Sequence, residues 1–210
     1  MDKSLAEKIK NVDITPKEIS HFKTKEWNYR KGLSVENSTR EIVNIWKCDP
    51  FFAKIIFNEN IGKMICDLMG WSGCRLAQDE LFWKPHLGGS VGYHQDGPYL
   101  DFLPAETIAI WVPLNDVSIE NGTLEYATGS HNWKTPSGII DDFHNPLKFK
   151  LKMEDAAMIE GIEKPDIHVV TLKRGGVSFH HGKLWHGSSK NPSSTKEMCF
   201  SFHTRKLCIQ

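Results

Sequence analysis

Residues 74–97 read CRLAQDELFWKPHLGGSVGYHQDG and carry the clearest structural signal in the chain. The first eleven, Cys74–Lys84, are typical of a β-strand, and Gly88-Gly89 marks a turn after it. His94 and Asp96 follow two positions apart, so on an extended backbone both side chains leave the same face of the chain. These residues therefore predict a strand, a turn and a place where an imidazole and a carboxylate meet.

Short runs typical of strands continue to the end of the chain, separated by Gly-, Pro- or Asn-containing turns. The expected strands are Cys74–Lys84, Thr107–Leu114, Gly122–Ala127, His168–Leu172, Gly176–His181 and Glu197–Thr204. Such a series is typical of an antiparallel sandwich or barrel. Residues 134–167 interrupt it, with a short helix expected at 152–161. A long insertion in a compact β fold usually serves as a functional lid or rim, and we expect a lid here.

Before residue 74 the apolar spacing is helical. Ser38 and Glu41 form a capping-box pattern, and Asp49-Pro50 is a second helix start because proline is tolerated at the first helical position. Apolar residues after Pro50 recur at spacings of three and four. We therefore expect a single domain, mainly β with flanking α. A helical arm would occupy residues 1–73, and a jelly roll (double-stranded β-helix, cupin-like) would occupy residues 74–210.

Charge and composition exclude several classes of protein. The 210 residues include 26 Lys+Arg and 26 Asp+Glu, so the formal net charge is zero, and we expect no nucleic-acid partner. No apolar run approaches the roughly 20 residues that span a bilayer, and the N-terminus is too charged for a signal peptide. The five cysteines are scattered, which predicts no disulfide framework. We expect a soluble cytoplasmic protein; the oligomeric state stays open.

A second candidate ligand lies late in the chain, where His186-Gly187-Ser188 follows an apolar strand. Antiparallel sandwiches place early and late strands side by side, which would bring an imidazole next to His94 and Asp96. Two histidines and a carboxylate form the facial triad of non-haem Fe(II) oxygenases, which leaves three positions open for substrate and O2. The spacing alone is weak evidence, because a His-x-Asp triplet is more often a surface feature than a ligand pair.

The sequence resembles the phytanoyl-CoA dioxygenase family of iron- and 2-oxoglutarate-dependent oxygenases. Four blocks carry the resemblance in family order: Lys84-Pro85, His94-Gln95-Asp96, the segment from Ile110 to His131, and His186-Gly187-Ser188 followed by Asn191. The resemblance implies that His94, Asp96 and His186 are the Fe(II) ligands and the catalytic centre. It also implies that 2-oxoglutarate chelates the metal and that O2 is the oxidant.

Further residues are implied to contact the cosubstrate. Lys84 matches a lysine, Trp111 a tryptophan and Ser188 a serine that border 2-oxoglutarate in relatives, and Gln95 stands between two ligands as it does there. The family usually has an arginine ten to twelve residues after the distal histidine, where it holds the far carboxylate. This chain has Lys196 at that spacing, which supplies the charge without the planar fork of arginine. We expect Lys196 to hold the far carboxylate.

The implied activity is hydroxylation of an aliphatic C–H in a small molecule, with release of succinate and CO2. Asp96 favours hydroxylation because related halogenases have a small residue there, while desaturation and ring closure stay open. The alternative is a non-catalytic metal-binding cupin-like module or sensor, which the change from arginine to lysine keeps open. Either His180 or His181 must face inward on its strand, where we expect a hydrogen-bonded core histidine rather than a fourth ligand.

Overall fold

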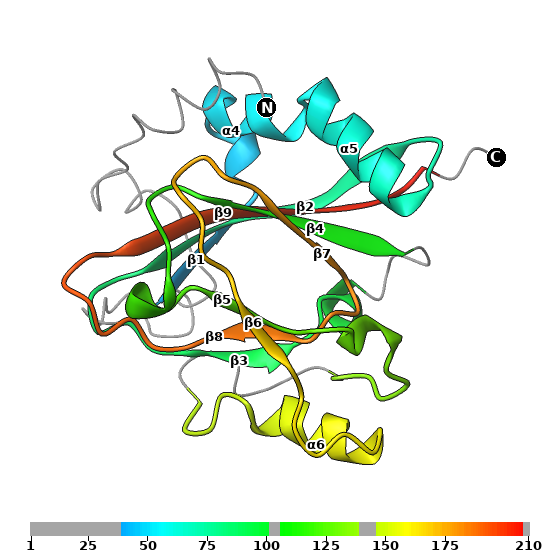
Figure 1. Ribbon diagram of the computed structural model, residues 1–210. Coiled ribbons are helices and arrows are strands. Elements are labelled where there is room, and N and C mark those ends of the chain that lie inside the picture. The colour runs from blue at the N-terminus through cyan, green and yellow to red at the C-terminus, as the bar shows by residue number, and fades with distance from the viewer. Residues whose placement is uncertain (1–38, 101–105, 139–145, 208–210) are drawn as a thin grey trace.

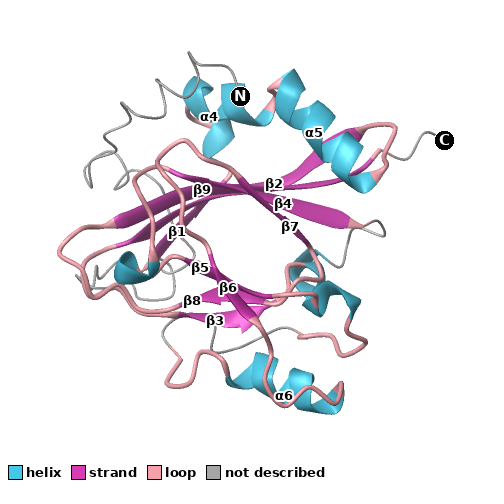
Figure 2. Ribbon diagram, in the orientation of Figure 1, coloured by secondary structure: helices cyan, strands magenta, loops and turns pink. Residues whose placement is uncertain are grey.

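The computed structural model describes residues 39–100, 106–138 and 146–207, and its strands form two antiparallel sheets (Figure 1; Figure 2). The five-stranded sheet has the order β1 (Arg40–Val43), β2 (Cys74–Lys84), β9 (Glu197–Lys206), β4 (Thr107–Pro113) and β7 (Ser178–His181). The four-stranded sheet has the order β3 (Val91–His94), β8 (His186–Ser188), β5 (Leu124–Ala127) and β6 (Ile167–Val169). Early and late strands are neighbours in both sheets, and the expected jelly roll is confirmed.

Helices cover the outer face of each sheet (Figure 1). Helices α4 (Pro50–Ile56) and α5 (Glu59–Met69) lie on the five-stranded sheet, and α6 (Leu151–Ile159) lies below the four-stranded sheet. The main apolar core lies between the sheet and the first two helices. It includes Phe52, Ile55, Ile61, Ile65, Leu81, Ile110, Phe200 and Phe202. Because a strand alternates its side chains, the opposite residues of β2, β4 and β9 face the interior between the two sheets.

The expected helix start at Asp49-Pro50 is confirmed. Asp49 caps α4 by accepting a hydrogen bond from the Phe51 backbone N–H at 2.8 Å, and Pro50 is the first helical residue. Helix α5 begins in the same way, with the Asn58 side chain accepting from two backbone N–H groups. It ends at Gly70, whose φ of +64° is the left-handed conformation that favours glycine.

The prediction of a helical arm over residues 1–73 is wrong for residues 40–43, which form β1. This strand pairs with β2, with Arg40 opposite Trp83 and Val43 opposite Glu80. Glu41, which we assigned to a capping box, lies within the strand; Ser38 lies outside the described residues. Pairing with the long β2 buries Ile42 to 2% exposure in the main core, a long-range gain that outweighs a local capping signal.

The insertion over residues 134–167 contains the expected helix, displaced slightly to α6 (Leu151–Ile159). Its Met153 and Ala156 pack against Tyr93 and Trp185 on the outer face of the four-stranded sheet. Residues 139–145 lie outside the described part of the chain. The helix thus supports this sheet from outside, and a lid function for the insertion stays a prediction.

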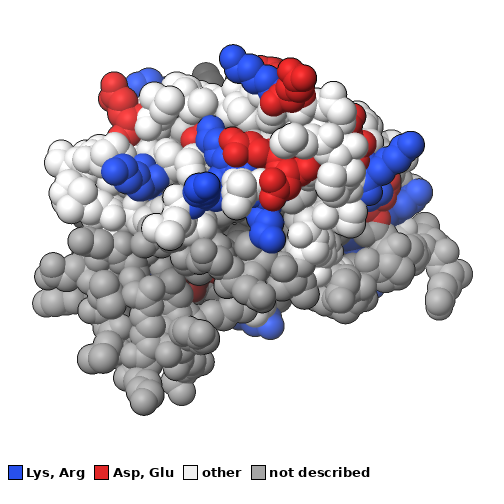
Figure 3. Space-filling model, turned by 90° about the horizontal axis from the view of Figure 1, so that it is seen from below, with Lys and Arg blue, Asp and Glu red and all other residues white. Residues whose placement is uncertain are grey.

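Charged side chains of both signs are interspersed over the described part of the face in Figure 3. This distribution agrees with the formal net charge of zero. Among the described residues, no helix has both the length and the apolar character that a membrane crossing requires.

Candidate metal centre and cosubstrate pocket

Two neighbouring strands and a turn bring the three expected ligands together. His94 ends β3 and stands opposite His186, the first residue of β8, with ring centroids 4.2 Å apart. Asp96 follows β3 in a turn that is closed by two backbone hydrogen bonds, from Gly97 to Gly182 at 2.9 Å and from Tyr99 to Asp96 at 3.0 Å. All three side chains are buried.

The candidate ligand atoms face one another. His94 Nε2 lies 3.7 Å and His186 Nε2 lies 3.4 Å from Asp96 Oδ1, and each residue offers one ligand atom within 4.8 Å of the others. Each imidazole donates its Nδ1–H to a backbone carbonyl, His94 to Gly92 at 2.8 Å and His186 to Leu184 at 2.9 Å. These bonds hold the rings with Nε2 toward the carboxylate, the arrangement typical of metal-ligating histidines. Two imidazoles and one carboxylate fit Fe(II).

The charge states of these groups also suit a cation. Burial and the neighbouring His186 lower the pKa of His94 to about 3, so the ring is neutral at neutral pH. Burial alone would raise the pKa of Asp96, but His186, His203 and hydrogen bonds from His180 and His203 hold it well below its usual range. Neutral imidazole and ionised carboxylate are the forms that bind metals.

Two further histidines contact the other oxygen of Asp96. His180 of β7 and His203 of β9 each place Nε2 3.3 Å from Asp96 Oδ2. His180 is therefore the inward-facing member of its pair, and its Nδ1 lies 3.1 Å from the Tyr126 hydroxyl. Sequence reasoning did not single out His203. Alternation along β9 places it on the inner face, but its proximity to Asp96 depends on how the two sheets face each other.

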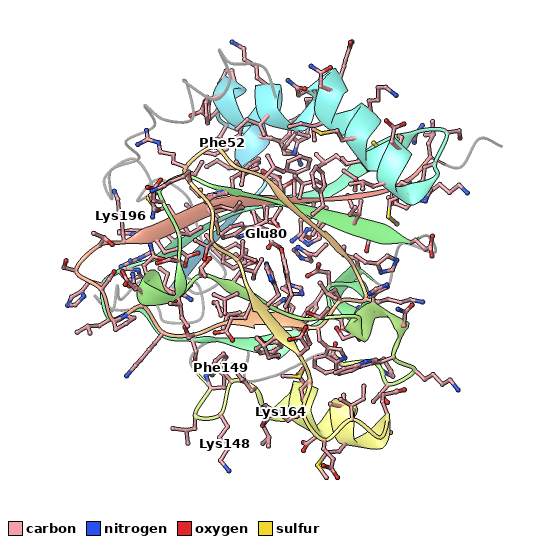
Figure 4. The ribbon with its side chains drawn as sticks, viewed as in Figure 1. Phe52, Glu80, Lys148, Phe149, Lys164 and Lys196 are labelled. Carbon is pink, nitrogen blue, oxygen red and sulfur yellow. The ribbon has the colours of Figure 1, made fainter. Side chains whose placement is uncertain are left out.

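Glu80 of β2 and Glu41 of β1 form an acidic pair that continues this polar region along the inner face of the five-stranded sheet. Figure 4 shows Glu80 between the two sheets, where it accepts a hydrogen bond from Gln78. Burial raises the pKa of Glu80 to about 8, with a further contribution from Glu41 of β1, while His203 opposes the shift. This acidic pair was also missed, because Glu41 was assigned to a helix.

Lys84 and Ser188 meet beside the centre. Ser188 lies two residues after His186 on β8 and is therefore on the same face of that strand. Lys84 Nζ donates to Ser188 Oγ at 2.5 Å, to the Ser189 carbonyl at 2.7 Å and to the Gly122 carbonyl at 2.9 Å. Gly122 has a φ of +75°, and an added Cβ would lie 2.7 Å from two carbonyl oxygens, so only glycine fits this close approach.

The structure places Glu197, rather than Lys196, next to this lysine. Glu197 begins β9 directly opposite Lys84, and its carboxylate lies 3.8 Å from Lys84 Nζ with both side chains less than a tenth exposed. Burial raises the pKa of Glu197 to about 7, and it lowers the pKa of Lys84. Lys196 directly precedes β9 and lies toward the outside of the molecule, while Glu80 lies in the interior (Figure 4). The role expected of Lys196 stays a prediction.

The remaining two predicted residues occupy different environments. Trp111 lies on β4 in a small buried cluster between the sheets, together with Tyr126 and Cys199. Gln95 donates from Nε2 to the Lys183 carbonyl at 2.5 Å and accepts from a backbone N–H at Ser137. These bonds tie the ligand turn to two loops. The structure therefore gives Gln95 a supporting position, and its contact with the cosubstrate stays a prediction.

Curated relatives match about three quarters of the chain. A phytanoyl-CoA dioxygenase domain-containing protein 1 from Danio rerio is 27% identical over 157 residues, covering 74% of this chain and 53% of that protein. A phytanoyl-CoA dioxygenase from Arabidopsis thaliana is 25% identical over 158 residues, covering 74% of this chain and 52% of that protein. The chain spans about half the length of the curated relatives it matches.

Two solved structures share the fold of this chain. EctD from S. alaskensis, crystallised with 2-oxoglutarate and 5-hydroxyectoine, has a TM-score of 0.65 at 20% identity, covering 80% of this chain and 56% of that chain. The epimerase SnoN, crystallised with Fe3+, alpha ketoglutarate and nogalamycin RO, has a TM-score of 0.67 at 15% identity. The match covers 98% of this chain and 76% of that chain.

The family model for phytanoyl-CoA dioxygenase (PhyH) matches residues 10–198, nearly the whole sequence. That span includes the three clustered ligand candidates and both residues of the Lys84–Glu197 pair. The chain therefore belongs to the phytanoyl-CoA dioxygenase family.

Proposed function

We propose that this protein is an Fe(II)- and 2-oxoglutarate-dependent dioxygenase that hydroxylates an aliphatic C–H of a small molecule. The observation that carries the proposal is the convergence of His94, Asp96 and His186, whose ligand atoms lie within 4.8 Å of one another. Family membership supports it, because the three candidate metal ligands lie inside the matched span. A cytoplasmic location is part of the same proposal.

Iron bound by these residues would supply O2 activation, so that one oxygen atom enters the substrate C–H bond and the other enters succinate as 2-oxoglutarate loses CO2. His94, Asp96 and His186 would hold the metal from one side and leave the opposite positions open. The backbone bonds at Nδ1 keep both rings oriented, and burial between the sheets limits access of water. His180 and His203 each place Nε2 3.3 Å from the second oxygen of Asp96 and would support the carboxylate from behind.

The substrate class rests on the structural neighbours. EctD and SnoN were each crystallised with a small organic molecule, 5-hydroxyectoine and nogalamycin RO respectively. We infer a small-molecule substrate for this chain. Asp96 supplies the carboxylate that distinguishes a complete facial triad, which supports hydroxylation.

The test compares an oxygenase with a non-catalytic metal-binding module. Anaerobic protein that receives Fe(II) and 2-oxoglutarate should develop a weak visible charge-transfer band, and air should then produce succinate even without substrate. His94→Ala should lose both signals. His131→Ala is a matched control, because His131 is exposed and should leave both signals unchanged. Metal binding without the band or succinate would favour the non-catalytic module and overturn the proposal.

A further inference from the structure

Lys84 and Ser188, which the family resemblance implies border 2-oxoglutarate, meet beside Glu197, and the following inference rests on the proposed function. Ser188 is two residues from the candidate ligand His186 and receives a hydrogen bond from Lys84 Nζ at 2.5 Å. Of the residues predicted to border the cosubstrate, Lys84 is the cation that the structure places against Ser188. A carboxylate that reached Ser188 would therefore also meet Lys84 and Glu197.

The lysine has no spare donor in this arrangement. An ammonium group has three N–H bonds, and Lys84 directs them at Ser188 Oγ and at the carbonyl oxygens of Ser189 and Gly122. To bind an additional carboxylate, Lys84 must give up one of these bonds. Ser188 is the most replaceable partner, since its hydroxyl can itself donate to a carboxylate.

The charges around the pair also oppose the binding of an anion. Lys84 on β2 and Glu197 on β9 cancel each other at a separation of 3.8 Å. The other titratable groups acting on the pair are Cys199 on β9 and Glu125 on β5, and neither supplies positive charge. An incoming carboxylate would leave this buried region with a net negative charge, which is costly away from water.

We propose that the far carboxylate of 2-oxoglutarate binds at Lys84 and Ser188 only when Glu197 carries a proton, so that cosubstrate binding takes up one proton. The protonated carboxyl leaves Lys84 with an unopposed positive charge. It also offers an O–H donor to the incoming carboxylate. Glu197 thereby makes the affinity for the cosubstrate depend on pH.

The acidity of Glu197 is suited to this role. Burial raises its pKa to about 7, with Lys84 opposing the shift, so a large fraction of the group is protonated at neutral pH. Above that pH, each further unit should weaken 2-oxoglutarate binding tenfold, because the proton must first be acquired. Affinity at pH 8.5 should therefore be about 30-fold weaker than at pH 6.

Calorimetric titration of 2-oxoglutarate into the Zn(II)-loaded protein tests the proposal. At pH 8, heats in two buffers of different ionisation enthalpy report the number of protons taken up, and the expected value is close to one. Titration with 2-oxopentanoate is the ligand control. It keeps the metal-chelating groups and lacks the far carboxylate, so its binding should take up no proton.

Two variants test whether Glu197 is the residue that takes up the proton when 2-oxoglutarate binds. Glu197→Gln should bind 2-oxoglutarate without proton uptake, with nearly equal affinity at pH 6 and pH 8.5. Glu80→Gln is the matched control, since Glu80 is the other inward-facing acid with a raised pKa, and uptake should persist there. Uptake that survives Glu197→Gln, or that disappears in Glu80→Gln, would overturn the proposal.

Measurements on the wild-type protein alone also test the proposal, whether or not the variants fold. Equal 2-oxoglutarate affinity at pH 6 and pH 8.5 without proton uptake would overturn this inference and leave the proposed function standing. Binding of 2-oxopentanoate without binding of 2-oxoglutarate at pH 6 would have the same consequence. Failure of the metal-loaded wild type and of Glu197→Gln to bind either 2-oxo acid at any pH would overturn both.

Discussion

The two faces of β9 are almost equally buried and differ completely in chemistry. The outer face presents Met198, Phe200 and Phe202 to the helices, and Phe200 packs against Phe52 with ring centroids 4.7 Å apart. The inner face presents Glu197, Cys199, Ser201 and His203 to the space between the sheets. One strand thus contributes apolar packing on one side and the candidate site on the other. Burial alone does not distinguish a stabilising residue from a functional one.

The two faces differ in what each residue requires of its neighbours. An apolar side chain such as Phe200 contributes roughly 1.5–3 kcal/mol by leaving water, wherever it finds close packing. A buried charge needs a specific partner to offset the loss of hydration. Glu197 has Lys84, and His203 has Asp96, both supplied by distant parts of the chain. The inner face is therefore the one whose stability depends on particular pairs.

The largest expected effect is loss of the metal. Asp96→Ala removes the single carboxylate from the candidate triad, and we expect metal affinity to fall by more than about 100-fold, beyond the usual effect of outer partners. Co(II) titration followed by visible absorbance measures it. Asp116→Ala is the control, because Asp116 is an exposed carboxylate paired with Lys173 and should leave the titration unchanged. Metal affinity within a few-fold of wild type in Asp96→Ala would remove this residue from the centre.

Truncation on the outer face should affect stability alone. Phe200→Ala creates a cavity where the side chain is now 0% exposed, and the free energy of unfolding should fall by about 3–5 kcal/mol. Urea denaturation measures this loss. Co(II) affinity of the folded variant should stay within about twofold of wild type, since the ring points away from the metal centre. A large change in metal affinity would show that the two faces are coupled.

Glu197 should make the stability of the metal-free protein fall as pH rises. Its folded pKa of about 7 lies above the ordinary value of 4.5, so the folded state holds the proton more tightly than the unfolded state. This contribution is complete below pH 4.5 and is lost as pH rises through about 7, on the order of 3 kcal/mol in total. Glu197→Gln should therefore gain stability relative to wild type between pH 5 and pH 8 in urea denaturation. A constant difference between the two proteins would contradict this.

Replacing His203 should lower the affinity for the metal, although His203 is not one of the candidate ligands. His203→Gln keeps a polar group beside Asp96 Oδ2 but alters the contact that orients the carboxylate. Partners of this kind usually contribute 10–100-fold to metal affinity, and we expect a loss of about that size by Co(II) titration. Met198→Leu on the opposite face of the same strand is the control and should leave metal affinity unchanged. An unchanged affinity in His203→Gln would assign the histidine a purely structural role.

Local sequence patterns predicted much of this molecule. The alternation from Cys74 to Lys84 matches β2 in both bounds, and Asp49-Pro50 marks the start of α4. Both patterns act between near neighbours, where backbone geometry settles the conformation. The short strands β3 and β8 were not predicted, since each contains a glycine, which weakens the signal of a strand. Residues 40–43 were assigned to a helix because the edge of β2 that stabilises them lies far along the chain.

For the site, a local spacing and a family resemblance were enough to name His94, Asp96 and His186 as ligands that should meet. Spacing identifies which side chains share a face, and that information lies within a few residues. The partners of the buried charges required the folded chain. Only the register between β2 and β9 sets Glu197 opposite Lys84, and only the facing of the two sheets brings His203 to Asp96. Those contacts join residues far apart in sequence, so they are decided by how strands pair and sheets stack.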